Sequence, residues 1–247
     1  MFTEQQVKNL KIIFVGSITV INIFFMWFQD YIGAVSLLTW ASIIGMTIWG
    51  ALYSYKKVPF DKLIILAILA MIIGFLTEFI GSHEGLWDFG LYNPPYFIIT
   101  GWVLLSLTML ILTELAYESK YVPSIPTSQY DQYIGAFIPV ILLIYLVSTL
   151  GAYRTDAGFM FYAYYVGLTV INGIYYYKHH NNRKLLLAII AAWIVGLFAE
   201  VIGVESALWA FSYEFPVWIV ISGWSLEWLV ILAGVKFVKD IVRHNSV

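Results

Sequence analysis

Two glutamates, Glu78 and Glu200, stand near the ends of long apolar stretches, directly before short loops of polar and aromatic residues. Acidic side chains inside apolar spans are costly, usually face the interior of a helix bundle and are candidates for function. A carboxyl group in such a place can donate a proton to a weak base and accept one back. The alternative is that both carboxyl groups lie at the edge of the span and only bond the following loop or lipid headgroups.

The stretch around Glu78 occurs twice in the chain. Residues 78–102 and 200–224 match without gaps at 10 of 25 positions, and the matches include Glu, Pro and two Trp in register. Thr47 with Thr169 and Lys62 with Lys184 match at the same offset of 122 residues. An apolar composition alone does not produce such matches, so we infer an internal duplication. We expect residues 1–120 and 121–247 to form two four-helix repeats of one membrane domain.

Glycines accompany both glutamates at helical spacing. Gly74 and Gly81 share a helical face with Glu78, and Gly196 and Gly203 share one with Glu200. Small residues on such a face favour either close helix packing or room for a ligand.

A third carboxyl group, that of Glu227, lies roughly midway along the last apolar stretch. Its counterpart at the offset of 122 residues is Leu105, so the duplication does not require it. An ionisable group near the middle of a span is a candidate for a role that only one half has. The alternative is a carboxyl group paired with a tyrosine for packing. We therefore predict Glu78, Glu200 and Glu227 as catalytic residues.

Aromatic side chains accompany these carboxyl groups in both halves. Aromatic faces stabilise cations, and together with an acid they suit carbocation chemistry. The same rings also fit ordinary core packing, which is the more common role of any single tryptophan. The predicted substrate-binding residues are Trp87, Phe89 and Trp102 in the first half and Trp209, Phe211 and Trp224 in the second.

The composition sets the class of protein. Of the 247 residues 61% are hydrophobic and 11% are charged, whereas a soluble domain carries about 25% charged residues. Several apolar runs reach the roughly 20 residues that span a bilayer, so we predict an all-α integral membrane protein. The net charge of −2 gives no basic surface for nucleic acid, and the absence of cysteine excludes disulfides and thiolate metal sites.

Eight spans fit the apolar runs, with approximate bounds 10–28, 31–53, 62–81, 95–116, 133–151, 157–177, 184–203 and 216–238. Four spans in each half would give both halves the same orientation, as in parallel repeats. A polar, proline-containing linker over 117–131 would separate them. Of the 13 Lys and Arg residues, only Arg154 falls on one side of the membrane. The positive-inside rule then predicts a multi-pass protein of the cell membrane with both termini in the cytoplasm.

A metal site in the first loop is the alternative for three neighbouring side chains. His83, Glu84 and Asp88 are close enough in sequence to bind a divalent ion. The second copy of the loop keeps neither the histidine nor the aspartate. We predict no metal and no cofactor.

The two loops resemble the lycopene cyclase domain, a small membrane-integral carotenoid enzyme found as two subunits or as a tandem fusion. The shared pattern is an acidic residue, six others, and then Gly-x-Trp-x-aromatic. The matching residues are Glu78, Gly85, Trp87 and Phe89 in the first copy and Glu200, Trp209 and Phe211 in the second, where Ala207 replaces the glycine. Glu227, in Gly223-Trp-Ser-Leu-Glu, is similar to the glutamate of a second family motif. The pattern Glu78, Gly81, Gly85, Phe89, Gly90 and Tyr92 also resembles the carotenoid hydratases.

This resemblance implies a non-redox enzyme that cyclises or hydrates a carotenoid or another isoprenoid lipid within the membrane. The first alternative is a proton-coupled transporter or lipid-binding protein with its site between the repeats, since paired intramembrane carboxyl groups suit proton coupling. A second alternative is a membrane assembly factor that has lost an ancestral activity. The expected partners are a hydrophobic lipid and the membrane.

Overall fold

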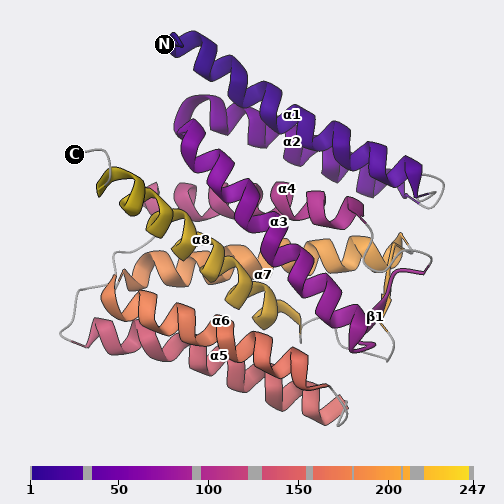
Figure 1. The fold of residues 1–247 in the computed structure, drawn as a ribbon, viewed down its shortest axis with the longest axis vertical. Helices are drawn as coiled ribbons and strands as arrows, with labels where there is room; N and C mark the ends of the chain where they lie inside the picture. Colours follow the sequence, from indigo (N-terminus) through magenta and orange to yellow (C-terminus); the bar gives the residue numbers. More distant parts are fainter. Residues whose placement is uncertain are drawn as a thin grey trace.

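The chain folds into a bundle of long helices (Figure 1). The computed structural model describes residues 2–29, 35–90, 96–121, 130–153, 158–179, 181–206, 208–211 and 220–244. The helices in this part of the chain are α1 (Glu4–Phe28), α2 (Leu37–Lys57), α3 (Phe60–His83), α4 (Tyr96–Glu118), α5 (Asp131–Tyr153), α6 (Phe159–Lys178), α7 (Asn182–Glu205) and α8 (Val220–His244).

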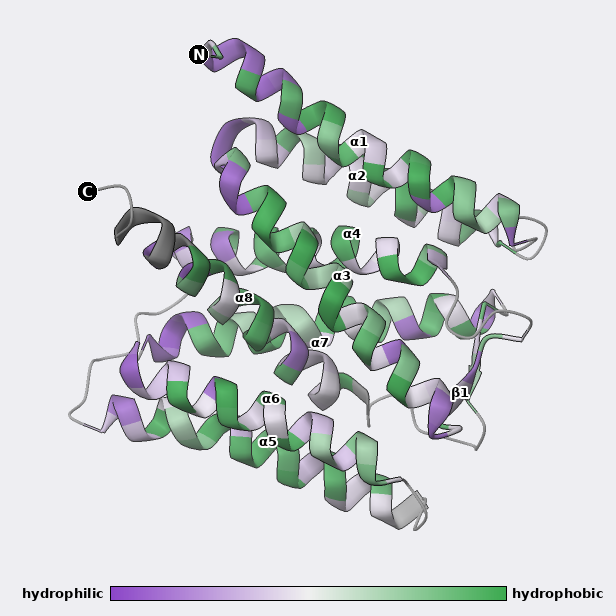
Figure 2. Cartoon of the chain, in the orientation of Figure 1, coloured by the Kyte–Doolittle hydropathy of each residue, from purple (hydrophilic) through white to green (hydrophobic). Residues whose placement is uncertain are grey.

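Seven of these helices are long and apolar enough to cross a membrane, which makes the chain a multi-pass membrane protein. Many large apolar side chains cover their outer faces, as lipid contact requires. The predicted span 157–177, which corresponds to α6, falls outside this set. Tyrosines and Asn172 lower its hydropathy, although it packs along α5. Figure 2 shows the hydrophobic residues along the helices and the strongly hydrophilic ones mostly near their ends.

Four helices form the centre of the bundle, and a pair of helices lies on either side of them. Helices α3, α4, α7 and α8 pack against one another at the centre (Figure 1). The pair α1 and α2 packs on α4, and the pair α5 and α6 packs on α8. The core therefore lies among the four central helices, and α3 and α7, which carry Glu78 and Glu200, both belong to it.

Helix positions agree with the spans predicted from the sequence. Each described helix overlaps its predicted span, and the ends differ by at most six residues. Residues 31–34, 95, 157 and 216–219 of the predicted spans, and residues 122–129 of the predicted linker, lie outside the described residues. The all-α prediction is thus confirmed in its main lines, and the duplication into two repeats stays a prediction.

The loops that follow α3 and α7 meet in a short antiparallel pair of strands. Strand β1 (Trp87–Asp88) pairs with β2 (Ala210–Phe211), with Trp87 opposite Phe211. Two residues on each side carry no pattern that indicates a strand, and the sequence did not predict this pairing. The pairing holds the two similar loops together at one end of the bundle.

The opposite end of α3 and α7 carries ion pairs. Glu114 Oε1 accepts hydrogen bonds from Lys62 Nζ at 3.2 Å and from Lys184 Nζ at 3.0 Å. Lys57 and Glu118 form a further pair at 3.3 Å. Glu114, which stood near the end of its predicted span, therefore joins the two central helices through their first turns.

Candidate functional site

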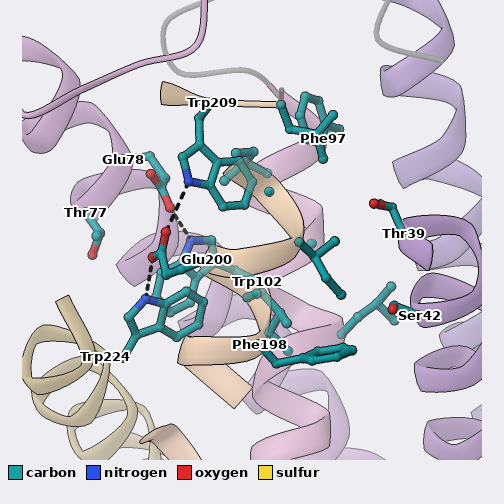
Figure 3. Close-up of a pocket in the computed structure, with 18 of the residues that line it drawn as sticks. Thr39, Ser42, Thr77, Glu78, Phe97, Trp102, Phe198, Glu200, Trp209 and Trp224 are labelled. Atoms are coloured by element: carbon teal, nitrogen blue, oxygen red, sulfur yellow. Dashed lines mark hydrogen bonds between the residues drawn. The ribbon is translucent and has the colours of Figure 1, made fainter. Parts of the chain in front are cut away.

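A cavity of about 130 Å³ lies among the central helices, next to the paired loops (Figure 3). Glu78 of α3, Glu200 of α7 and Glu227 of α8 all line it. The three glutamates that the sequence singled out, up to 149 residues apart, therefore share one cavity.

Tryptophan side chains hold the first two carboxyl groups in place. Trp102 Nε1 donates to Glu78 Oε1 at 2.9 Å, and Trp224 Nε1 donates to Glu200 Oε1 at 2.8 Å. Trp209 Nε1 donates to the other oxygen of Glu200 at 3.1 Å (Figure 3). Glu78 is half-buried and Glu200 is buried. Glu200 thus bonds the following loop, as the alternative required, but Trp102 and Trp224 belong to the following helices, so neither carboxyl group bonds only the loop or headgroups.

The two central tryptophans stack on each other. The rings of Trp102 and Trp224 lie 4.4 Å apart between centroids and 15° from parallel. Each ring also reaches a glutamate of the neighbouring helix, so the stack connects the carboxyl group of Glu78 with that of Glu200. Removal of either ring would disturb both halves of the cavity.

The glycines beside the glutamates serve close packing. At each of the four positions, a Cβ atom would overlap an indole ring, so only glycine leaves room for the tryptophan. Of the two interpretations open from the sequence, these contacts support close packing, and Gly203 in addition lines the cavity. The pairs are Gly74 with Trp102, Gly81 with Trp87, Gly196 with Trp224, and Gly203 with Trp209.

Glu227 lines the cavity and is 1% exposed. Its Oε1 atom accepts hydrogen bonds from Thr77 Oγ1 at 2.9 Å and from the Tyr165 hydroxyl at 2.7 Å. The Tyr164 hydroxyl lies 2.8 Å from Thr77 Oγ1 and extends this chain. Glu227 is therefore paired with a tyrosine, as the packing alternative required, and it also faces the cavity.

The aromatic residues of the loops close the end of the cavity. Trp87 contacts Phe211 edge to face at 6.5 Å, and Phe89 contacts Trp209 at 6.1 Å, so each loop gives one ring to each pair. All six predicted substrate-binding residues line the same cavity as the glutamates. Their role toward a substrate stays a prediction.

The cavity residues that belong to α1 and α2 were not predicted from the sequence. Asn22, Thr39, Ser42, Ile43 and Met46 line the cavity although they belong to no repeated motif. One signal was available, because an asparagine within an apolar span is itself unusual. The Asn22 Nδ2 atom donates to Thr100 Oγ1 at 3.0 Å and to the carbonyl of Phe97, which ties α1 to α4.

The ionisable side chains described in the cavity lining are acidic. Among the described residues, those that line the cavity include three glutamates and no lysine, arginine or histidine. Their hydrogen-bond donors are indole, hydroxyl and amide groups. Such a lining can exchange protons and stabilise positive charge, and it offers no cation to hold a phosphate or a carboxylate.

The three side chains weighed as metal ligands have other contacts. The His83 ring stacks on Phe79 at 6.0 Å, and Asp88 Oδ1 accepts the backbone N–H of Gly90 at 2.9 Å. The Glu84 carboxyl group packs against Gly158 at the start of α6. In the described part of the chain, no three His, Asp or Glu side chains gather as a metal ion would require.

No protein-family model, curated protein or solved structure matches this chain. The functional assignment therefore depends on the cavity itself.

Proposed function

We propose that this protein is a membrane-embedded enzyme that acts on a carotenoid or another isoprenoid lipid, by proton-driven cyclisation or hydration. The observation that carries the proposal is the gathering of Glu78, Glu200 and Glu227 with stacked indoles in one apolar cavity. Acid groups supply and remove protons, and indole faces stabilise the cation between those steps.

The proposed reaction conserves the atoms of the substrate. A carboxylic acid gives its proton to one carbon of the terminal double bond, which leaves a cation on the neighbouring carbon. A nearby double bond attacks that carbon to close a ring, and a carboxylate then takes a proton from the carbon beside the new cation. Alternatively, a carboxylate directs water onto the first cation, and the water loses a proton to give an alcohol.

The positions of the carboxyl groups suggest a division of these roles. Glu78 and Glu200 accept hydrogen bonds from the stacked Trp102 and Trp224, while Glu227 accepts hydrogen bonds from Tyr165 and from Thr77, the residue before Glu78. We assign proton donation to Glu200 or Glu78, whose hydrogen bonds come from indoles lining the cavity. Glu227, which Thr77 and Tyr165 orient, is the candidate for removing the final proton.

We also infer that residues 1–120 and 121–247 are parallel repeats. The Glu–Trp pairs and the Gly–Trp contacts recur at matching positions in both halves, and the two loop strands match to within one residue. In this arrangement α6 also crosses the membrane, and its tyrosines face protein as well as lipid. Twelve of the 13 basic residues would then place both termini in the cytoplasm.

Protease accessibility of terminal tags in right-side-out vesicles tests the orientation. Tags at either terminus should be cut only after the vesicles are opened. A tag that is cut in intact vesicles places that terminus outside and refutes the orientation.

The first test of the proposed activity supplies the purified protein with an acyclic polyene. Lycopene in lipid nanodiscs is a suitable probe, because ring closure changes its absorbance at constant mass and hydration changes its mass. We expect a cyclic isomer or a hydrated product by chromatography and mass spectrometry. The absence of both a product and bound polyene absorbance would refute the proposal. Lipid flux in proteoliposomes would then favour the transport alternative.

A further inference from the structure

The cavity reaches the outer surface of the bundle between α2 and α7. Phe198 lines the cavity and is also 48% exposed on α7. Ser42 and Met46 of α2 line it too and are half-buried. Figure 3 shows Thr39 and Ser42 on one helix, across the cavity from Glu200. Both helices belong to the set that can cross a membrane, so this opening faces lipid.

Hydroxyl groups close the loop end of the α2–α7 contact. Thr39 Oγ1 lies 2.6 Å from Ser206 Oγ, which donates to Ser36 Oγ at 2.9 Å. Thr39 is buried, whereas Ser42 lies one helical turn further into the membrane. The opening therefore lies to the side of the bundle, below this hydroxyl cluster.

The matching place in the second half, between α6 and α3, is filled by aromatic rings. At the offset of 122 residues, Phe161, Tyr164 and Tyr165 stand where Thr39, Ser42 and Ile43 stand in the first half.

Three contacts hold these rings. The Tyr164 hydroxyl bonds Thr77 on α3 at 2.8 Å, the Tyr165 hydroxyl bonds Glu227, and the Phe161 and Tyr165 rings lie 4.7 Å apart. The cavity is thus open to lipid beside α2 and closed beside α6.

The size of the cavity limits what it holds. An apolar cavity of about 150 Å³ accommodates a molecule the size of benzene. At about 130 Å³, this cavity takes the end of a long chain and not its whole length. The rest of such a chain would leave through the opening between α2 and α7 and remain in the bilayer.

We propose that the cavity binds one linear apolar chain from the bilayer, end first, through the opening between α2 and α7 beside Ser42 and Phe198. The terminal unit of the chain lies at the Trp102–Trp224 stack, within reach of Glu78 and Glu200. The identity of the chain as an isoprenoid rests on the proposed function, whereas the opening and the end-first binding do not.

The test uses Ser42→Tyr, which introduces the residue that fills the matching place in the second half. The matched control is Ile44→Tyr, because Ile44 lies on the same helix, is 51% exposed and does not line the cavity. The first probe is a phospholipid with a photoreactive diazirine at the end of one acyl chain. After illumination in nanodiscs, mass spectrometry locates the label.

We expect the native protein and Ile44→Tyr to be labelled inside the cavity, at Leu105 or Ala199, and Ser42→Tyr to lose that label at least tenfold. Labelling of the lipid-facing Ile48 serves as the internal standard, since it should not change. Cavity labelling of Ser42→Tyr at the native level, or none in the native protein, would overturn the proposal.

Lycopene absorbance in the same nanodiscs separates this proposal from the proposed function. If Ser42→Tyr loses bound lycopene while the native protein and Ile44→Tyr keep it, the result supports both the opening and the proposed function. Acyl-chain labelling of the cavity without lycopene binding supports the opening and refutes the isoprenoid assignment. Unchanged lycopene conversion in Ser42→Tyr supports the enzyme and refutes the opening between α2 and α7.

Discussion

Replacing Glu200 with glutamine is expected to slow conversion of an acyclic polyene by about 10²–10⁴-fold, the usual contribution of a general acid or base. The amide keeps the shape of the side chain and has no proton of comparable acidity to donate. Glu200 is the most informative of the three glutamates, because both of its oxygens accept indole N–H groups and its side chain is buried. The measurement is the initial rate of product formation in nanodiscs under single-turnover conditions.

Glu205→Gln is the matched control for this experiment. Glu205 lies on the same helix, is exposed and does not line the cavity, so its replacement should leave the rate within about twofold of native. Near-ultraviolet circular dichroism shows whether the indoles keep their packing, since one of Trp209 and Trp224 loses a carboxylate oxygen. A folded Glu200→Gln protein that converts polyene at the native rate would falsify the acid–base role of Glu200.

The helices could be predicted because each one is specified locally. A run of about 20 apolar residues can satisfy its backbone hydrogen bonds within lipid only as a helix, so length and hydropathy were enough to place it. Only α6 departs from this rule, because its tyrosines and Asn172 lower the hydropathy of a helix that packs against α5 and α8. Hydropathy cannot distinguish a tyrosine that bonds a neighbouring helix from one that faces water.

Part of the site could be predicted because the motif occurs twice. Glu78 and Trp102, 24 residues apart, sit on consecutive helices, and Glu200 and Trp224 repeat the spacing. The hydrogen bond within each pair joins two helices that follow each other in the chain, and the repeated motif drew attention to both pairs. The meeting of the two pairs in one stack depends on how α4 and α7 pack, which no local pattern encodes.

The remaining wall of the cavity could not be predicted for the same reason. Thr39 and Ser42 are small polar residues in an ordinary apolar span, and their position beside α7 follows from the tertiary fold. Their importance shows only by comparison with Phe161 and Tyr164, which fill the matching place in the second half.

Replacing Trp102 with alanine is expected to give the largest loss of stability, about 3 kcal/mol in the free energy of unfolding, at the lower end of the range for buried tryptophan. Trp102 is 1% exposed, stacks on Trp224, donates to Glu78 and packs against Gly74. The lower end applies because lipid solvates apolar side chains, so little hydrophobic transfer energy is lost on unfolding within a membrane. The loss comes from the emptied volume, the broken stack and the carboxyl group left without its indole partner.

Chemical unfolding in mixed micelles, followed by circular dichroism, measures this loss. Trp193→Ala is the control, since Trp193 is 44% exposed on α7 and should cost only a few tenths of a kcal/mol. Trp224→Ala and the double variant complete a cycle, and the stack predicts a coupling energy of about 0.5–3 kcal/mol between the two rings. Additive losses, or a Trp102→Ala protein as stable as Trp193→Ala, would show that the two rings do not hold the halves of the cavity together.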